Sequence, residues 1–159
     1  MIITHTSPDF DAIGAVWLLK RYGGMADAPV AFVNTGSPAP ALLTQADAVV
    51  DTGREYDPAR LRFDHHQLPG AAANETCATL QVFQWLTTQR SDLTHLNPLV
   101  ALIYAGDTGR ADYGADWSRQ VGIHALLSSL KATRPSDAAL LAYGMGLLDA
   151  LAEHLETRA

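Results

Sequence analysis

Residues 47–67 read DAVVDTGREYDPARLRFDHHQ, in which two short apolar runs each end in an acidic residue. The first run leads into Asp51, and the second leads into the triplet Asp-His-His at residues 64–66. Short runs of β-branched and aromatic residues that are bounded by glycine and proline predict strands. In open α/β sheets the ligand crevice lies outside the carboxyl ends of the strands, so both runs would deliver acids or imidazoles to such a crevice.

The rest of the chain alternates between short apolar runs and helical patterns. Strands are predicted at residues 2–4, 29–33, 48–50 and 61–63, and helices at 12–22, 41–45, 77–86, 99–105, 117–131 and 136–156. Such alternation indicates βαβ units with right-handed crossovers. We therefore expect an α/β fold with three layers, in which helices flank a mostly parallel sheet of about four to five strands and a helical C-terminal portion follows. The apolar stripe of the last helix predicts either core packing or a dimer surface.

Length and composition are typical of one globular domain. The chain has 159 residues, of which 48% are hydrophobic and 18% are charged, and a formal net charge of -6. We expect a single domain that spans residues 1–159. A broad nucleic-acid surface usually needs a basic face, so the acidic balance predicts that no long duplex nucleic acid is bound. The single cysteine, Cys77, excludes an intramolecular disulfide and is expected to face the core.

The sequence shows neither a targeting signal nor a membrane span. The N-terminal residues become polar after a short apolar run, and no apolar run approaches the roughly 20 residues that cross a bilayer. We therefore expect a cytoplasmic protein with no membrane partner.

A second group of acids follows the first predicted strand. His5 comes directly after this strand, and Asp9 and Asp11 flank Phe10 in the loop before the next helix. One aspartate alone is well explained as an N-cap, which accepts the free amide protons of the first helical turn. A helix uses only one N-cap residue, so capping alone does not explain the pair.

Residues that can bind metal therefore collect at the ends of the predicted elements. They are His5, Asp9, Asp11, Asp51, Asp64, His65, His66 and Asp107. Carboxylates in one cleft repel one another unless they are protonated or compensated, and two divalent ions would neutralise four of them. Oxygen and imidazole ligands without a thiolate favour manganese, magnesium, iron or cobalt. Two such ions about 3.5 to 4 Å apart suit the hydrolysis of phosphoester or phosphoanhydride bonds.

The same residues resemble the motifs of a known family. HTSPDFDAIG at residues 5–14, Asp51, DHH at 64–66 and DTG at 107–109 look like the four motifs of the DHH phosphoesterase superfamily, in the same order. The resemblance covers nearly all of the chain up to the fourth motif and implies a stand-alone phosphoesterase domain of that superfamily. A more local stretch, YDPARLRFDHHQ at residues 56–67, is also similar to a family of eukaryotic RNA exonucleases.

The resemblance implies a site with two divalent metal ions, with Mn²⁺ preferred over Mg²⁺, Co²⁺ or Fe²⁺. It implies that one ion is held by His5, Asp9 and Asp51, and the other by Asp11, Asp51, His65 and Asp107. His66 would face the substrate as a proton donor, and Asp64 would orient a histidine without binding metal.

The chain also departs from the superfamily pattern. Ala15 stands where the first motif often has serine. Most members append a second domain with a glycine-rich motif and basic residues that grip the substrate, and the helices predicted after Asp107 carry no such motif. We therefore expect substrate selection by this domain, by a partner in a possible homodimer, or by another protein.

Four arginines near the motifs are candidates for phosphate binding. Arg54 and Arg110 lie within three residues of proposed ligands and would clamp a phosphate, while Arg60 and Arg62 lie in the run before the triplet. Ordinary surface pairing with Glu55 or Asp112 is an equally good explanation of Arg54 and Arg110. The histidines on the later helices, His95, His124 and His154, are expected to be structural or surface residues.

Three functions compete on this basis. The first is a manganese-dependent phosphoesterase that acts on a small phosphorylated substrate, such as a nucleotide, a short oligonucleotide or a phosphoanhydride. The second is a metal-loaded binding or regulatory module without turnover. The third is a flavodoxin-like domain without metal, in which the aspartates only cap helices.

Overall fold

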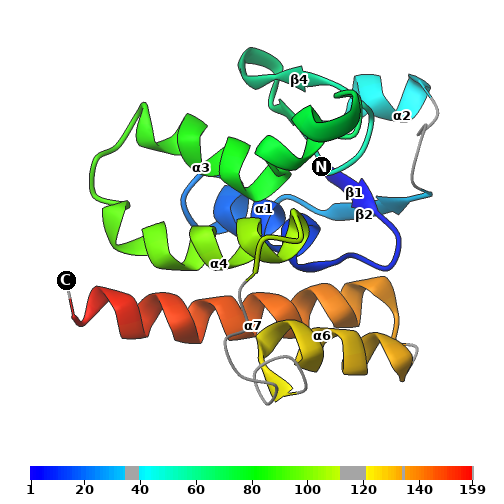
Figure 1. The fold of residues 1–159 in the computed structure, drawn as a ribbon. Helices are drawn as coiled ribbons and strands as arrows, with labels where there is room; N and C mark the ends of the chain where they lie inside the picture. The colour runs from blue at the N-terminus through cyan, green and yellow to red at the C-terminus, as the bar shows by residue number, and fades with distance from the viewer. Residues whose placement is uncertain (35–39, 112–120, 134, 159) are drawn as a thin grey trace.

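A mostly parallel sheet flanked by helices forms the fold of the computed structural model, which describes residues 1–34, 40–111, 121–133 and 135–158 (Figure 1). The strands are β1 (Ile2–His5), β2 (Val30–Val33), β3 (Ala48–Val50), β4 (Tyr56–Asp57) and β5 (Arg62–Phe63). The helices are α1 (Phe10–Arg21), α2 (Pro40–Gln45), α3 (Ala78–Thr87), α4 (Asn97–Asp107), α6 (Ile123–Ala132) and α7 (Asp137–Glu156), with short 3₁₀ helices η1 (Pro58–Arg60), η2 (Gly70–Glu75) and η3 (Thr94–Leu96). The predicted α/β class and the helical C-terminal portion are confirmed. Residues 117–120 of one predicted helix lie outside the described residues.

The strand order of the sheet is β2-β1-β3-β5-β4. All neighbouring pairs are parallel except β4 with β5, which is antiparallel and forms one edge. Residues 56–57 are not among the predicted strands, because a strand of two residues shows no apolar alternation. Leu61, with a left-handed φ of 54°, follows η1 and turns the chain back so that β5 pairs with β4.

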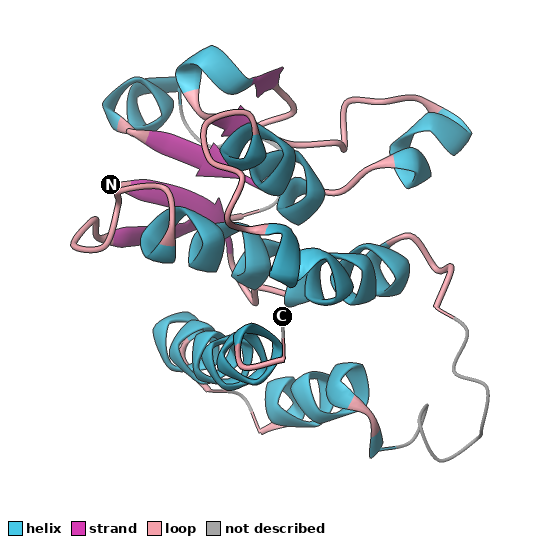
Figure 2. Cartoon of the chain, turned by 90° about the vertical axis from the view of Figure 1, so that its left-hand side faces the viewer, coloured by secondary structure: helices cyan, strands magenta, loops and turns pink. Residues whose placement is uncertain are grey.

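Alternate side chains of the strands pack on opposite faces of the sheet, as the pleat requires. Ile3 and Val49 pack with partly buried side chains of α2 in a small cluster on one face. Ile2 and Val50 belong to the main core on the other face, which α1 and α3 share. Figure 2 shows helices above and below the strands, with α6 and α7 as a further pair beneath α1 and α4.

Helix α1 lies at the centre of the main core. Every residue from Phe10 to Leu19 is buried, and the helix contacts β1, β3, α3, α4 and α7. A helix that is apolar on all sides is stable only when neighbours cover it completely. The candidate acids Asp9, the N-cap of α1, and Asp11, in its first turn, are therefore held by the best-packed element of the protein.

Helix α7 packs along α1 and is anchored by one carboxylate. Asp149 accepts a hydrogen bond of 2.8 Å from Nε1 of Trp17 and pairs in bidentate fashion with Arg21. Leu148, the residue before Asp149, is fully buried in the core. The apolar stripe predicted for this helix thus packs in the core of the same chain. No helix in the described part of the chain is long and apolar enough to span a membrane.

Two glycines of α7 differ sharply in their surroundings. A Cβ on Gly144 would lie 2.8 Å from both Cδ1 and Cγ2 of the buried Ile13, so this glycine allows α7 to approach α1 closely. A Cβ on Gly146 would meet no atom within 4 Å. Of these two glycines, only Gly144 therefore allows a close approach between helices.

We expect opposite effects when alanine replaces these two glycines. Gly144→Ala should lower the free energy of unfolding by about 1 to 2 kcal/mol, because its methyl group overpacks the contact with Ile13. Gly146→Ala should raise it by about 0.5 to 1 kcal/mol, because alanine loses less backbone entropy in a helix. Urea unfolding of both variants measures the difference, and destabilisation of equal size would show that the close approach does not matter.

Candidate metal centre

Three neighbouring parallel strands bring candidate ligands to one edge of the sheet. His5 is the last residue of β1, Asp51 directly follows β3, and Asp64 directly follows β5. The strand register aligns the carboxyl ends of β1, β3 and β5. The three side chains therefore lie beside the position where open α/β sheets bind ligands.

Asp51 contributes to two groups of candidate ligands. Its backbone has a left-handed φ of 52°, and its side chain is only 2% exposed. Its Oδ2 lies 3.1 Å from Nε2 of His5, and the same nitrogen lies 3.8 Å from Oδ2 of Asp9. These three residues form the first group, whose ligand atoms all lie within 4.8 Å of one another.

Asp9 has two roles in the fold. Its Oδ1 caps α1 by accepting hydrogen bonds from the backbone N–H groups of Asp11 and Ala12. Its Oδ2 faces His5. Capping and a place in the ligand group are thus compatible, since each uses a different oxygen.

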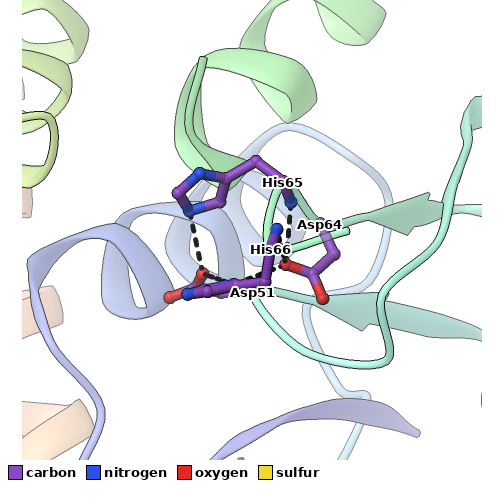
Figure 3. Close-up of side chains that lie close together, drawn as sticks. All are labelled: Asp51, Asp64, His65 and His66. Carbon is purple, nitrogen blue, oxygen red and sulfur yellow. Dashed lines mark hydrogen bonds and ion pairs between the residues drawn. The ribbon is translucent and has the colours of Figure 1, made fainter. Parts of the chain in front are cut away.

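The other oxygen of Asp51 faces the second group. Its Oδ1 lies 3.6 Å from Nε2 of His65. The same nitrogen lies 3.9 Å from Oδ2 of Asp11 and 3.7 Å from Oδ2 of Asp107. Figure 3 shows that both histidines of the triplet are linked to Asp51. The structure therefore brings together all six residues expected to bind metal.

The second group contains unsatisfied polar atoms at its centre. Within the described part of the chain, Oδ1 of Asp51 and Nε2 of His65 are buried and have no hydrogen-bond partner. Such atoms cost about 1 to 3 kcal/mol each. The separations of 3.6 to 3.9 Å are too long for hydrogen bonds. Ligand atoms about 2.1 Å from one shared ion lie about 3 to 4 Å apart, so these residues fit a divalent ion.

Asp11 is held in place by the start of α3. Its two carboxylate oxygens accept hydrogen bonds of 2.7 and 2.8 Å from the backbone N–H groups of Ala78 and Thr79. Cys77 lies beside it and forms a third possible ligand group with Asp11 and Asp107. Burial raises the pKa of the Cys77 thiol, so this side chain stays protonated and makes a poor ligand. Its position beside the acids was not foreseen.

Asp64 holds the loop of the histidines. Its side chain is fully buried, and Oδ1 accepts hydrogen bonds from the backbone N–H groups of His65 and His66. The same oxygen lies 2.7 Å from Nδ1 of His66, and Oδ2 accepts a 2.6 Å bond from the backbone N–H of Arg54. The hydrogen bond to Asp64 raises the pKa of His66, whose side chain remains 53% exposed.

Two glutamines that were not expected at the site hold the same loop. Nε2 of Gln67 and Nε2 of Gln81 donate to the backbone carbonyl of Asp64, at 2.7 and 3.2 Å. Gln81 belongs to α3, so this helix fixes both the loop and Asp11. Nothing in the local pattern around either glutamine signals this contact.

The ion-free cluster holds protons at neutral pH. Burial and the negative charges of Asp51 and Asp107 raise the pKa of Asp11 to about 8. Burial also raises the pKa of Asp107, to about 6. Burial alone would lower the pKa values of His65 and His5, but nearby carboxylates, Asp51 above all, raise them to about 9 and about 10. The cluster therefore favours positive charge, which either protons or metal ions supply.

The arginines near the motifs have varied surroundings. Arg54 is exposed at the rim of the loop. Arg110 pairs with Glu75 at 2.6 Å, contacts the hydroxyl of Tyr104 and lies over its ring. Arg62 is buried and donates to backbone carbonyls near the end of α2. Arg60 pairs with a neighbouring glutamate.

A cavity of about 260 Å³ opens beside the two ligand groups. It is lined by Asp9, Phe10, Asp11, Gly106, Asp107 and His124. His124, expected to be a structural or surface residue, packs its ring against Phe10 and Gly106. It lies on a helix far along the chain, and no local pattern relates it to the acids.

We expect manganese binding to release protons and to tighten as the pH rises from about 6 to about 9. Metal ions take up deprotonated ligands, whereas Asp107, Asp11 and His65 have pKa values of about 6, 8 and 9 in the ion-free fold. Each group that still holds its proton must lose it on binding, so affinity falls as the pH falls through this window. Titration calorimetry in two buffers with different ionisation enthalpies measures the release.

The variant Asp107→Asn serves as the control for this release. It should bind manganese more weakly and release fewer protons, because one titrating ligand has been removed. A binding enthalpy of the original protein that does not change with the buffer would contradict the proton release.

Comparison with known proteins identifies one family. Its profile matches residues 1–80, just over half of the chain, and its description is MYG1_exonuc, Uncharacterised protein family (UPF0160). The matched segment includes all of the candidate ligands except Asp107. No curated protein and no solved structure matches the chain.

The expected membership of the DHH phosphoesterase superfamily was wrong. The matching family is a different family of metal-dependent hydrolases, and no DHH family profile matches the chain. The resemblance rested on a few acids and histidines. Different families can use the same residue types as metal ligands, because the metal ion favours them. The match extends over 80 consecutive residues, so it outweighs those positions. The chain belongs to the family described as MYG1_exonuc, Uncharacterised protein family (UPF0160).

Proposed function

We propose that the protein is a hydrolase that uses two divalent metal ions to cleave a phosphoester bond in a nucleotide or short oligonucleotide. The family and the clustered acids and histidines point to a metal-dependent hydrolase. One observation carries the proposal. The two carboxylate oxygens of Asp51 face different ligand groups, Oδ2 toward His5 and Oδ1 toward His65. A carboxylate in this position can bridge two ions.

The residues divide naturally between the two proposed ions. His5, Asp9 and Asp51 would hold one, and Asp11, Asp51, His65 and Asp107 would hold the other. Oxygen and nitrogen donors of this kind suit Mn²⁺ best, with Mg²⁺, Co²⁺ or Fe²⁺ as alternatives. When bound, such ions supply a hydroxide at neutral pH and neutralise charge on the phosphate.

His66 is suited to protonate the leaving group. Its Nδ1 is held by the buried Asp64 at 2.7 Å, which fixes the ring and favours its protonated form. The side chain is half exposed, so it remains accessible to a substrate. A positioned imidazolium of this kind typically contributes about 100-fold to 10,000-fold in rate as a general acid.

The size of the cavity favours a small substrate. At about 260 Å³ it is slightly smaller than most pockets that hold a drug-sized ligand, so it would accept one nucleotide unit but not a duplex. The net charge of -6 also disfavours long nucleic acid. The abbreviation "exonuc" in the family description and the resemblance of residues 56–67 to RNA exonucleases favour a substrate of nucleic-acid origin. The exposed Arg54 remains a candidate for contact with its phosphates, whereas Arg110 would first have to leave Glu75.

We expect manganese-dependent hydrolysis of at least one substrate in a panel. The panel comprises a generic phosphodiester, mononucleotides, short RNA and DNA oligonucleotides, cyclic dinucleotides, pyrophosphate and polyphosphate. Chelation of the metal should abolish turnover, and His66→Ala should lower kcat by about 100-fold or more. His154→Ala, which changes an exposed histidine of α7, should leave turnover unchanged.

The variant Asp51→Asn tests the shared carboxylate separately. Asparagine tolerates the left-handed backbone at this position, so the fold should survive while the bridging charge is lost. We expect turnover to be abolished and the metal content, measured by elemental analysis, to fall. Full activity in this variant would reject the proposed site. A protein that binds two ions yet turns over nothing in the panel would favour the binding module.

A further inference from the structure

Helix α6 forms a wall of the cavity beside the acid cluster. The ring centroid of His124 lies 5.4 Å from that of Phe10, at an interplanar angle of 56°. The same imidazole fills the space in which a Cβ of Gly106 would sit, and its Nε2 lies 3.3 Å from the carbonyl oxygen of Leu102. His124 is thus held firmly at the edge of the cavity, where it forms an aromatic surface with Phe10.

A cation follows on the same face of α6. Lys131 lies seven residues after His124, which is about two helical turns, so the two side chains share one face. Leu127, between them on that face, is buried and anchors the helix. Lys131 lies in the last turn of α6, six residues before Asp137, whose carboxylate accepts a hydrogen bond from Ser7 in the loop that carries Asp9.

The end of this helix pair is tied to the loop before α1. The backbone N–H of Ser7 donates a 2.7 Å hydrogen bond to Oδ1 of Asp137, the first residue of α7. Ser7 has a left-handed φ of 52° and lies between His5 and Asp9. This bond fixes the start of α7 beside the acids, and α6 packs against α7.

We propose that α6 is the element that grips the substrate, a role for which no residue of this helix was expected. Lys131 would pair with a phosphate oxygen, and the wall of Phe10 and His124 would pack against the ring of an attached nucleoside. The inference rests on the proposed function, because it assumes a phosphorylated substrate in this cleft.

The charge balance of the cleft supports this role for Lys131. Bound divalent ions would neutralise the aspartates, which leaves the nearby ammonium group to attract an anion. Arg110 is already paired with Glu75, and the buried Arg62 donates to backbone carbonyls. Base stacking on aromatic side chains tolerates any base, which suits a cavity with few polar side chains beyond the acids.

Direct binding to the manganese-loaded protein tests the inference without turnover. The probes are adenosine 5′-monophosphate and inorganic phosphate, with affinities from titration calorimetry. Lys131→Met should weaken both probes by about fivefold, because both carry the anion. His124→Ala should weaken adenosine monophosphate by at least about fivefold and leave phosphate unchanged, because only the nucleotide carries a base.

Matched variants control for the fold and for general charge effects. Arg158→Met removes an exposed cation beyond α7, and His154→Ala removes an exposed histidine on α7; both should bind the probes like the original protein. His124→Gln keeps a donor toward Leu102 but lacks the ring, so it should reproduce the loss seen in His124→Ala. Manganese affinity should stay the same in all of these variants.

Two further outcomes would each overturn the inference in a distinguishable way. If Lys131→Met and His124→Ala bind both probes as tightly as the original protein does, α6 is not the gripping element, while the proposed function stands. If the original protein binds neither probe despite bound manganese, the proposed function fails and this inference fails with it.

Discussion

Mutual repulsion of buried carboxylates is the constraint around which this structure is organised. Asp9, Asp11, Asp51 and Asp107 meet in one cleft, where each carboxylate raises the free-energy cost of charging the others. The fold surrounds them with donors. Two backbone N–H groups at the start of α3 bind Asp11, the backbone at the start of α1 binds Asp9, and histidines face the carboxylate of Asp51.

These donors do not satisfy the cluster completely. Oδ1 of Asp51 and Nε2 of His65 remain without partners among the described residues, at the point where both ligand groups meet. Asp51 also has a left-handed backbone, which is unfavourable for most residues with a side chain. Strain and unsatisfied atoms at a single residue are typical of a site that is completed by a ligand.

Much of this arrangement could be predicted from local sequence. The strands and the acids that follow them are close in sequence, and parallel strands carry such residues to the same edge, so His5, Asp51 and Asp64 were correctly placed together. The short edge strand β4 was missed, because its pairing depends on the turn at Leu61. The family was misjudged, because a few metal-binding residues are less specific than the chain around them.

The contacts that sequence could not predict cross long stretches of chain. Cys77 meets Asp11, and His124 meets Phe10, although more than sixty residues separate the members of each pair. No periodic sequence pattern links the two residues of either pair, because only helix packing brings them together. Helix periodicity identifies which face is buried, but it does not identify the partner of that face.

The family match ends within α3, whereas the wall formed by α6 lies well beyond it. No ligand of the proposed ions comes from α6, so substitutions on its inner face leave the ligand set intact. On the role proposed for α6, changes on its inner face would therefore alter substrate binding while the metal ligands stay the same. Proteins that share the first eighty residues could differ in substrate through this one helix, and the same separation makes it the natural place to engineer a new specificity.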